Sequence, residues 1–108
     1  MSQKIYMLNA IWFKPKGGAA KFAEYLKLLA PLIEGVDGKK LRSMAPTRTL
    51  IGEFDADLIY FVEFPSWQAF KQFANTAKYH SLAFMREEAV EKSLLVRCDR
   101  ASIASIGS

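Results

Sequence analysis

Two side chains in this sequence are suited to moving a proton, Glu63 and His80. Glu63 is the one charge in the apolar run LIYFVEF at positions 58–64, and a partly buried carboxylate can act as a general acid or base. His80 is the only histidine of the chain, and imidazole changes its charge near neutral pH. Both are therefore candidate catalytic residues. Plainer interpretations stay open: a salt bridge or a solvated strand end for Glu63, and a surface position at a helix start for His80.

A second group of side chains is suited to holding a ligand. The Arg86 guanidinium could bind an anionic group through two parallel hydrogen bonds, and Tyr79 could stack on a ligand or donate a hydrogen bond. We expect such a site between the run 58–64 and a following helix, with Glu63 nearby. These residues could instead pin the helix to the sheet, with Arg86 in a structural salt bridge. By helical spacing, four residues share one face of that helix: Tyr79, Ala83, Arg86 and Val90.

Amide and aromatic side chains on the predicted strands could line a pocket for an aromatic ligand. Asn9, the polar exception in the apolar run 4–13, is one candidate, together with Trp12 and Tyr6 in the same run. Tyr60 in the run 58–64 is the other. The alternative is that these aromatic rings simply fill the core.

A metal or cofactor site is not indicated by the sequence. A zinc site needs several His, Cys or carboxylate ligands, whereas the chain has one histidine and one cysteine, Cys98. It also lacks a glycine-rich phosphate loop and a nucleophile elbow. We therefore expect no metal and no cofactor. A single cysteine excludes an internal disulfide, which suits a reducing compartment.

The composition is that of one ordinary globular domain. Of the 108 residues, 51% are hydrophobic and 24% are charged. The formal net charge is +4, and the basic residues are scattered, which argues against nucleic-acid binding. The first apolar run is too short for a signal peptide or a membrane span. We expect a cytoplasmic protein that does not contact membranes.

The patterning of residue types predicts elements in the order β-α-β-β-α-β. This order is typical of a ferredoxin-like α+β fold, a four-stranded antiparallel sheet with helices on one face. We assign residues 1–100 to this domain and 101–108 to a loose or crossing tail. The expected strands are 4–13, 39–46 with 48–52, 58–64 and 93–98, and the expected helices are 19–33, 67–74 and a segment carrying Leu82, Met85 and Ala89.

Two short motifs mark the boundaries on either side of helix 67–74. Pro65 cannot donate to a β-ladder and should end the strand, while Ser66 is a good N-cap for the helix. Asn75 and Thr76 are poor helix formers and should mark a break. This break would aim Tyr79 and Arg86 back toward the sheet.

The apolar runs 4–13 and 58–64 carry hydrophobic side chains at both odd and even positions. Both faces of a strand with this pattern need cover, yet helices of this fold cover one face of the sheet. A second copy of the same sheet is the simplest cover for the other face. We therefore predict a homodimer through the sheet face.

The run IGEFDADLIYFVEFPSWQAFKQFANTAKYHSLAFMREEA resembles the bacterial domain-of-unknown-function 1330 family of the dimeric α+β barrel superfamily. The residues that carry the resemblance are Gly52, the strand end Glu63-Phe64-Pro65-Ser66, Tyr79 and Arg86. The chain departs from the family pattern at Val36-Asp37-Gly38-Lys39, at Thr76 and at Val96-Arg97-Cys98-Asp99. The resemblance implies a dimeric barrel-like assembly. The wider superfamily includes cofactor-free monooxygenases, muconolactone isomerases, haem-degrading enzymes and stress-responsive proteins.

Three functions are compatible with these observations. The first is binding of a small organic ligand, aromatic or anionic, in a pocket between sheet and helices. The second is a cofactor-independent monooxygenase or isomerase. Some cofactor-free oxygenases of the superfamily use Asn, Trp and Tyr side chains of the kind found at Asn9, Trp12 and Tyr60. The third is a structural or stress-associated dimer without a ligand.

Overall fold

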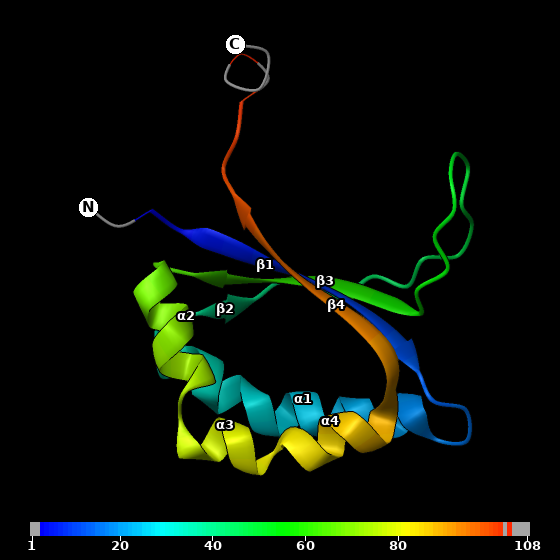
Figure 1. Ribbon diagram of the computed structural model, residues 1–108, viewed down its shortest axis with the longest axis horizontal. Coiled ribbons are helices and arrows are strands. Elements are labelled where there is room, and N and C mark those ends of the chain that lie inside the picture. The colour runs from blue at the N-terminus through cyan, green and yellow to red at the C-terminus, as the bar shows by residue number, and fades with distance from the viewer. Residues whose placement is uncertain (1–2, 103, 105–108) are drawn as a thin grey trace.

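The computed structural model describes residues 3–102 and 104 of the chain. It contains a single four-stranded sheet with α-helical segments on one side (Figure 1). None of the helices in the described residues is long and apolar enough to span a bilayer. In chain order the elements are β1 (Ile5–Phe13), α1 (Gly18–Glu34), β2 (Lys39–Lys40), β3 (Leu58–Phe64), α2 (Trp67–Ala74), α3 (Ala77–Ser81), α4 (Ala83–Ala89) and β4 (Val90–Asp99).

The sheet is antiparallel and has the strand order β2-β3-β1-β4. The two strands that are apolar at both odd and even positions, β1 and β3, lie side by side at its centre. Asn9 pairs with Tyr60 across them, and Leu95 of β4 lies on the other side of Asn9. This topology confirms the predicted ferredoxin-like α+β fold.

One face of the sheet packs on the helices and forms the core. Because strand side chains alternate between faces, this face receives the odd-numbered residues of β1 and the even-numbered residues of β3. The helix α1 contributes a stripe of buried residues at helical spacing. The largest fully buried side chains are Phe22, Phe64, Ile5 and Ile11.

The opposite face of the sheet carries apolar side chains that the described helices leave uncovered. We call it the open face. Its centre is apolar, whereas a Lys4–Glu63 ion pair lies at one end and Lys92 at the other. By strand register its apolar residues are Tyr6, Leu8, Ala10, Trp12, Ile59, Phe61, Leu94 and Val96.

The second strand predicted over 39–46 and 48–52 is wrong in extent. Only Lys39–Lys40 form β2, and one further bridge joins Met44 to Ile59. After this bridge the chain leaves the sheet, because Pro46 has no N–H to donate to a ladder. Residues 45–54, called the arm below, rise from the open face and return at the start of β3 (Figure 1).

The other boundaries follow the sequence more closely. Ser66 caps α2 by accepting a hydrogen bond from the Ala69 N–H at 3.1 Å, and the predicted break at Asn75 and Thr76 separates α2 from α3. The last strand is longer than predicted, because β4 begins directly after α4 at Val90. Most of the predicted tail 101–108 lies outside the described residues.

Candidate functional site

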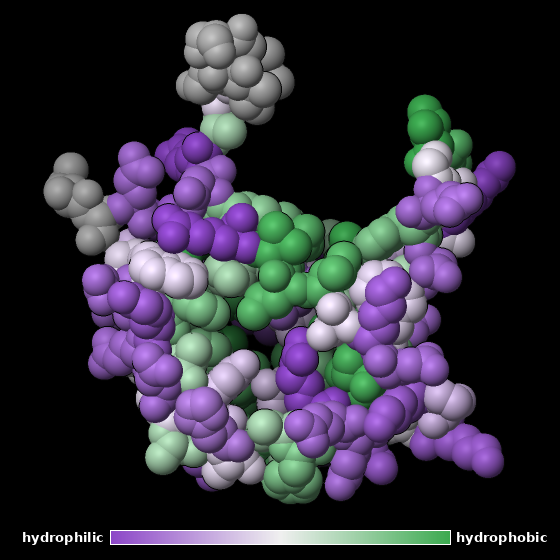
Figure 2. All heavy atoms as spheres, viewed as in Figure 1, coloured by the Kyte–Doolittle hydropathy of each residue, from purple (hydrophilic) through white to green (hydrophobic). Residues whose placement is uncertain are grey.

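A pocket lies between the core face of the sheet and the helices. Its volume is about 270 Å³, just below the range of about 300–1,000 Å³ common for drug-sized ligands. Figure 2 shows a hollow at the centre of the molecule, with a hydrophobic ridge above it. Every strand except β2, and every helical segment, contributes to the lining: Met7, Asn9, Tyr25, Leu29, Ile33, Tyr60, Val62, Phe64, Phe70, Phe73, Tyr79, Arg86, Ser93 and Leu95.

The polar part of this lining consists mainly of hydrogen-bond donors. Burial raises the pKa of Tyr25 to about 12, the neighbouring Tyr79 adds to this shift, and the Arg86 guanidinium opposes it. Burial likewise raises the pKa of Tyr60, and Arg86 opposes that shift as well. Both buried phenols therefore keep their protons at neutral pH and can donate hydrogen bonds.

Asn9 adds an amide to the same lining. It is buried, with 8% of its surface exposed, and its Nδ2 donates to the Met7 carbonyl at 3.2 Å. An amide has two N–H donors and a carbonyl acceptor, so one donor and the acceptor remain beyond this bond. Asn9 thus leaves one N–H donor and one carbonyl acceptor available in the pocket lining.

The helix breaks direct Tyr79 and Arg86 toward the pocket. Thr76 caps α3 by accepting a hydrogen bond from the Tyr79 N–H at 3.2 Å, and Leu82 separates α3 from α4. The Tyr79 ring lies 4.9 Å from the buried Phe73 ring, centroid to centroid. Four predicted ligand-binding residues, Asn9, Tyr60, Tyr79 and Arg86, therefore reach one pocket. Their role in binding stays a prediction.

Glu63 does not join these residues, contrary to the predicted placement. Its side chain projects to the open face, because it pairs with Tyr6 on β1 and is offset by one from the core-facing Phe64. There its carboxylate accepts a hydrogen bond from Lys4 Nζ at 2.8 Å, and this bond raises the pKa of Lys4. The alternative interpretation of Glu63, a salt bridge, is the one the structure shows.

His80 and Trp12 also lie outside the pocket. His80 is an exposed residue of α3 whose ring meets Tyr79 edge-on, so its predicted proton-transfer role has no place in the pocket lining. Trp12 projects to the open face, where its Nε1 donates to Asp55 Oδ1 at 2.8 Å and Lys92 Nζ lies 4.6 Å above its ring. Trp12 and Asn9 therefore cannot contact one ligand from the same side of the sheet.

Tyr25 is the site residue that sequence reasoning missed. No residue of the predicted helix 19–33 was among the candidate site residues. In α1 the buried stripe includes Tyr25 between Phe22 and Leu29, and the Tyr25 side chain lines the pocket. The available signal was a polar-tipped aromatic residue three positions after Phe22, on the same helical face.

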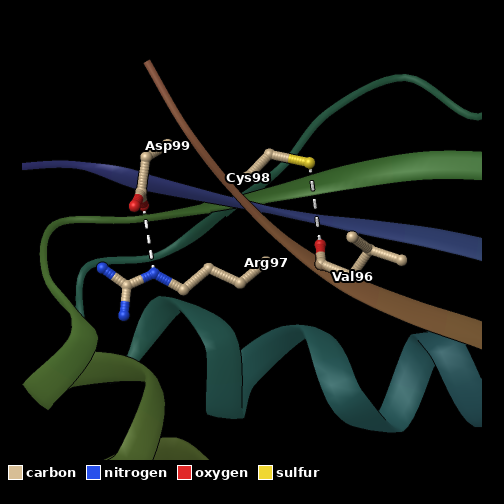
Figure 3. A network of polar contacts seen from close by, with 4 residues as sticks. All are labelled: Val96, Arg97, Cys98 and Asp99. Carbon is tan, nitrogen blue, oxygen red and sulfur yellow. Dashed lines mark hydrogen bonds and ion pairs between the residues drawn. The ribbon is translucent and has the colours of Figure 1, made fainter. Parts of the chain in front are cut away.

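A stack of side chains fastens β4 to α2 at one end of the pocket. The Arg97 guanidinium lies 4.9 Å from the Trp67 ring centroid, and Trp67 stacks on the pocket residue Phe70 at 5.1 Å. Arg97 Nε also donates to Asp99 Oδ1 at 3.0 Å, and Figure 3 shows both side chains on one side of β4 and Cys98 on the other. This stack fixes the free edge of the sheet above the pocket.

The polar groups of the pocket lining are of several kinds and do not form a metal-ligand cluster in the described residues. Among the described residues, no group of three or more His, Cys, Asp or Glu side chains lies close enough to hold a metal ion. The pocket lining contains one guanidinium, three phenols, one amide and one hydroxyl within an apolar wall.

A family model described as "Domain of unknown function (DUF1330)" matches residues 16–97. The chain belongs to the DUF1330 family. This confirms the resemblance carried by the strand end Glu63-Phe64-Pro65-Ser66, Tyr79 and Arg86. The search of curated proteins gives no significant match.

Solved structures similar to this DUF1330 chain share its fold. The RPA0582 protein of unknown function from Rhodopseudomonas palustris is 27% identical, with a TM-score of 0.85 over 94% of this chain and 85% of that one. A dimeric ferredoxin-like protein of unknown function from Jannaschia is 14% identical, with a TM-score of 0.72 over 90% and 99%. Hydroxynitrile lyase from Passiflora edulis is 12% identical, with a TM-score of 0.74 over 94% and 96%.

Proposed function

We propose that this DUF1330 protein binds a small organic anion with an apolar or aromatic body. The observation that carries the proposal is the pocket lining, in which Arg86 faces Tyr25 and Tyr60 within an apolar wall. No acidic side chain is among the residues that line this pocket in the described part of the chain. A cation with neutral donors around it leaves an excess of positive charge that an anionic ligand would balance.

The two ends of the pocket have separate roles in the proposed complex. Arg86 holds a carboxylate or similar anion through its planar fork, while Tyr79 and Tyr25 donate hydrogen bonds to the same group. The rings of Phe64, Phe70 and Phe73 contact the body of the ligand. These rings pack on one another, with Phe64 centred 5.4 Å from each of the other two, and together form an aromatic wall on which the body of the ligand can stack.

Calorimetric titration with aromatic carboxylates tests the proposal. We expect binding of benzoate-type acids and none of the matched neutral amides. Arg86→Gln should weaken binding by about 10- to 100-fold, since hydrogen bonds to charged groups contribute about 1.5–3 kcal/mol. Tyr79→Phe should have a smaller effect.

The control for this titration is Arg42→Gln, which removes an exposed arginine outside the pocket and should leave binding unchanged. If the Arg86→Gln variant unfolds more easily but binds the acids with wild-type affinity, Arg86 has a structural role and does not bind the ligand. Acids and amides that bind equally would show that the pocket recognises shape and no charge.

Catalysis is the second candidate, and its support is weaker. Hydroxynitrile lyase from Passiflora edulis shares the fold and is an enzyme. In this chain, however, the described pocket lining has no carboxylate, imidazole or amine to act as a general base. A cofactor-independent monooxygenase or isomerase would have to use a substrate that ionises readily beside Arg86. Oxygen consumption or isomerisation of a bound acid would favour this function over simple binding.

We further propose that the protein is a homodimer through the open face. The apolar centre of that face with its charged ends has the organisation of a protein interface. The dimeric ferredoxin-like protein from Jannaschia has the same fold, which supports the proposal. Sedimentation should give a particle of twice the 12.2 kDa chain mass.

A further inference from the structure

The arm exposes two large aliphatic side chains at its tip. Leu50 is 80% exposed and Ile51 is 96% exposed, the highest fractions among the large exposed hydrophobic residues of the described chain. Gly52 follows at φ 86°, a conformation that favours glycine, and turns the chain back. Such a pair of side chains in water is the kind of surface that a partner covers.

The arm is closed on itself near its tip and is anchored to β1 at its base. Near the tip, Thr49 Oγ1 donates to the Phe54 carbonyl at 2.6 Å. At the base, Asp55 accepts from Trp12 Nε1 at 2.8 Å, and Asp57 Oδ2 accepts from the Phe13 N–H at 2.8 Å. The two bonds at the base tie the arm to the end of β1, so its direction is set by the sheet.

The arm points away from the helices, on the side of the open face (Figure 1). Ile51 lies four positions before the anchored Asp55, and an extended chain spans at most about 3.3–3.6 Å per residue. The tip can therefore stand up to about 13–14 Å from its anchor. Stacked sheets pack about 10 Å apart. The chain is thus long enough for the tip to reach the level of a second sheet placed on the open face.

We propose that the arm is a clasp for a second copy of the chain, in which Leu50 and Ile51 pack against the edge of the partner's sheet. The inference rests on the homodimer proposed above. A second copy is favoured over another partner because the arm is continuous with the open face through the Phe54–Trp12 edge contact at 5.9 Å. In a twofold dimer both arms act at once, so each interface residue counts twice.

A lipid surface is the main alternative for an exposed aliphatic tip. Within the arm, residues 45–54, Arg48 and Glu53 are the charged residues and their charges cancel. Attraction to anionic lipid needs clustered basic residues, and the arm has none. The observations therefore favour the protein partner, and vesicle binding serves as an opposing outcome of the test.

The test is sedimentation equilibrium of the Leu50→Ser/Ile51→Ser double variant across a dilution series. We expect a dimer dissociation constant at least tenfold higher than that of the wild type, with the same far-UV circular dichroism. The control is Phe84→Ser, which removes a large exposed apolar residue on α4, at 57% exposure, and should leave the dissociation constant unchanged.

Each other outcome overturns a specific statement. A dimeric wild type whose arm variant keeps the same dissociation constant overturns the clasp and leaves the dimer standing. A wild type that sediments as a monomer overturns the dimer and the clasp together. Wild-type protein that floats with phosphatidylglycerol vesicles while the arm variant does not would assign the tip to a lipid surface and overturn the clasp.

Discussion

Arg86 and the phenols around it constrain one another. The guanidinium favours a phenolate and so lowers the pKa of Tyr25 and Tyr60, whereas burial raises it. For both tyrosines burial has the larger effect on the pKa. The tyrosines consequently remain neutral donors beside a permanent cation. This combination explains why the pocket should select an anion and why its selectivity should persist over the whole neutral range of pH.

The raised pKa of Tyr25 predicts a loss of stability at alkaline pH. In the folded state the phenol ionises at about 12, and in the unfolded chain near 10.0. Between these values the folded state binds more protons, so the free energy of unfolding should fall as pH rises. Urea unfolding from pH 9 to about 12 measures this slope.

The control for the alkaline titration is Tyr25→Phe, which has no phenol to ionise. Its free energy of unfolding should depend less steeply on pH than that of the wild type over the same window. Equal slopes for the two proteins would mean that Tyr25 is already accessible to water in the fold.

At this scale the sequence predicted part of the site. Asn9 and Tyr60 from one predicted group, and Tyr79 and Arg86 from the other, reach the same pocket, because their spacing places them on the core side of strands and helices. Trp12 was grouped with Asn9 in spite of opposite parity along one strand, and strand side chains of opposite parity cannot share a face. The odd or even position of each residue along the strand therefore decides which side of the sheet it faces, and these positions could be read from the sequence.

The elements that shape the pocket depend on short capping motifs. Ser66 starts α2, and Thr76 starts α3 by hydrogen bonding to the Tyr79 N–H. Each cap satisfies a backbone donor that the first helical turn leaves unpaired. These caps fix the angle at which Phe70 and Tyr79 enter the pocket.

Removing the Ser66 hydroxyl should therefore weaken the fold. The Ala69 N–H now donates to Ser66 Oγ at 3.1 Å, and Ser66→Ala would lower the free energy of unfolding by about 0.5–2 kcal/mol. Ser66→Asp should restore most of this loss, because aspartate is an equally good N-cap. Urea denaturation of the three proteins decides the matter. An alanine variant as stable as the wild type would show that packing alone positions α2.

The second strand shows where element prediction failed. Leu50 and Ile51 have the side chains of a strand, but no neighbouring strand is available to them, since β3 begins only at Leu58. The residue types of a segment indicate its propensity to form a β-strand, but they do not show whether a neighbouring strand is available to pair with it. The same residues that suggested a strand are, in the structure, the apolar tip of the arm.

The pocket and the open face lie on opposite sides of the same sheet. The pocket lies on the helix side, and the open face lies on the other, so a dimer through the open face leaves both pockets free (Figures 1 and 2). Binding and assembly should therefore be independent to first order. Arg86 variants should not change the dissociation constant of the dimer, and arm variants should not change ligand affinity.

Cys98 offers a reporter for the dimer because it is the only cysteine of the chain. It pairs with Tyr6 on the open face and is partly accessible in the isolated protomer. A dimer through that face would cover the thiol, so its reaction with a maleimide should be slow in concentrated protein and faster on dilution. The control is Cys98→Ser/Ser81→Cys, whose thiol lies on the exposed surface of α3 and should react at the same rate at every concentration. A rate for Cys98 that is equally independent of concentration would mean that the open face stays in contact with water, and the homodimer proposal would be wrong.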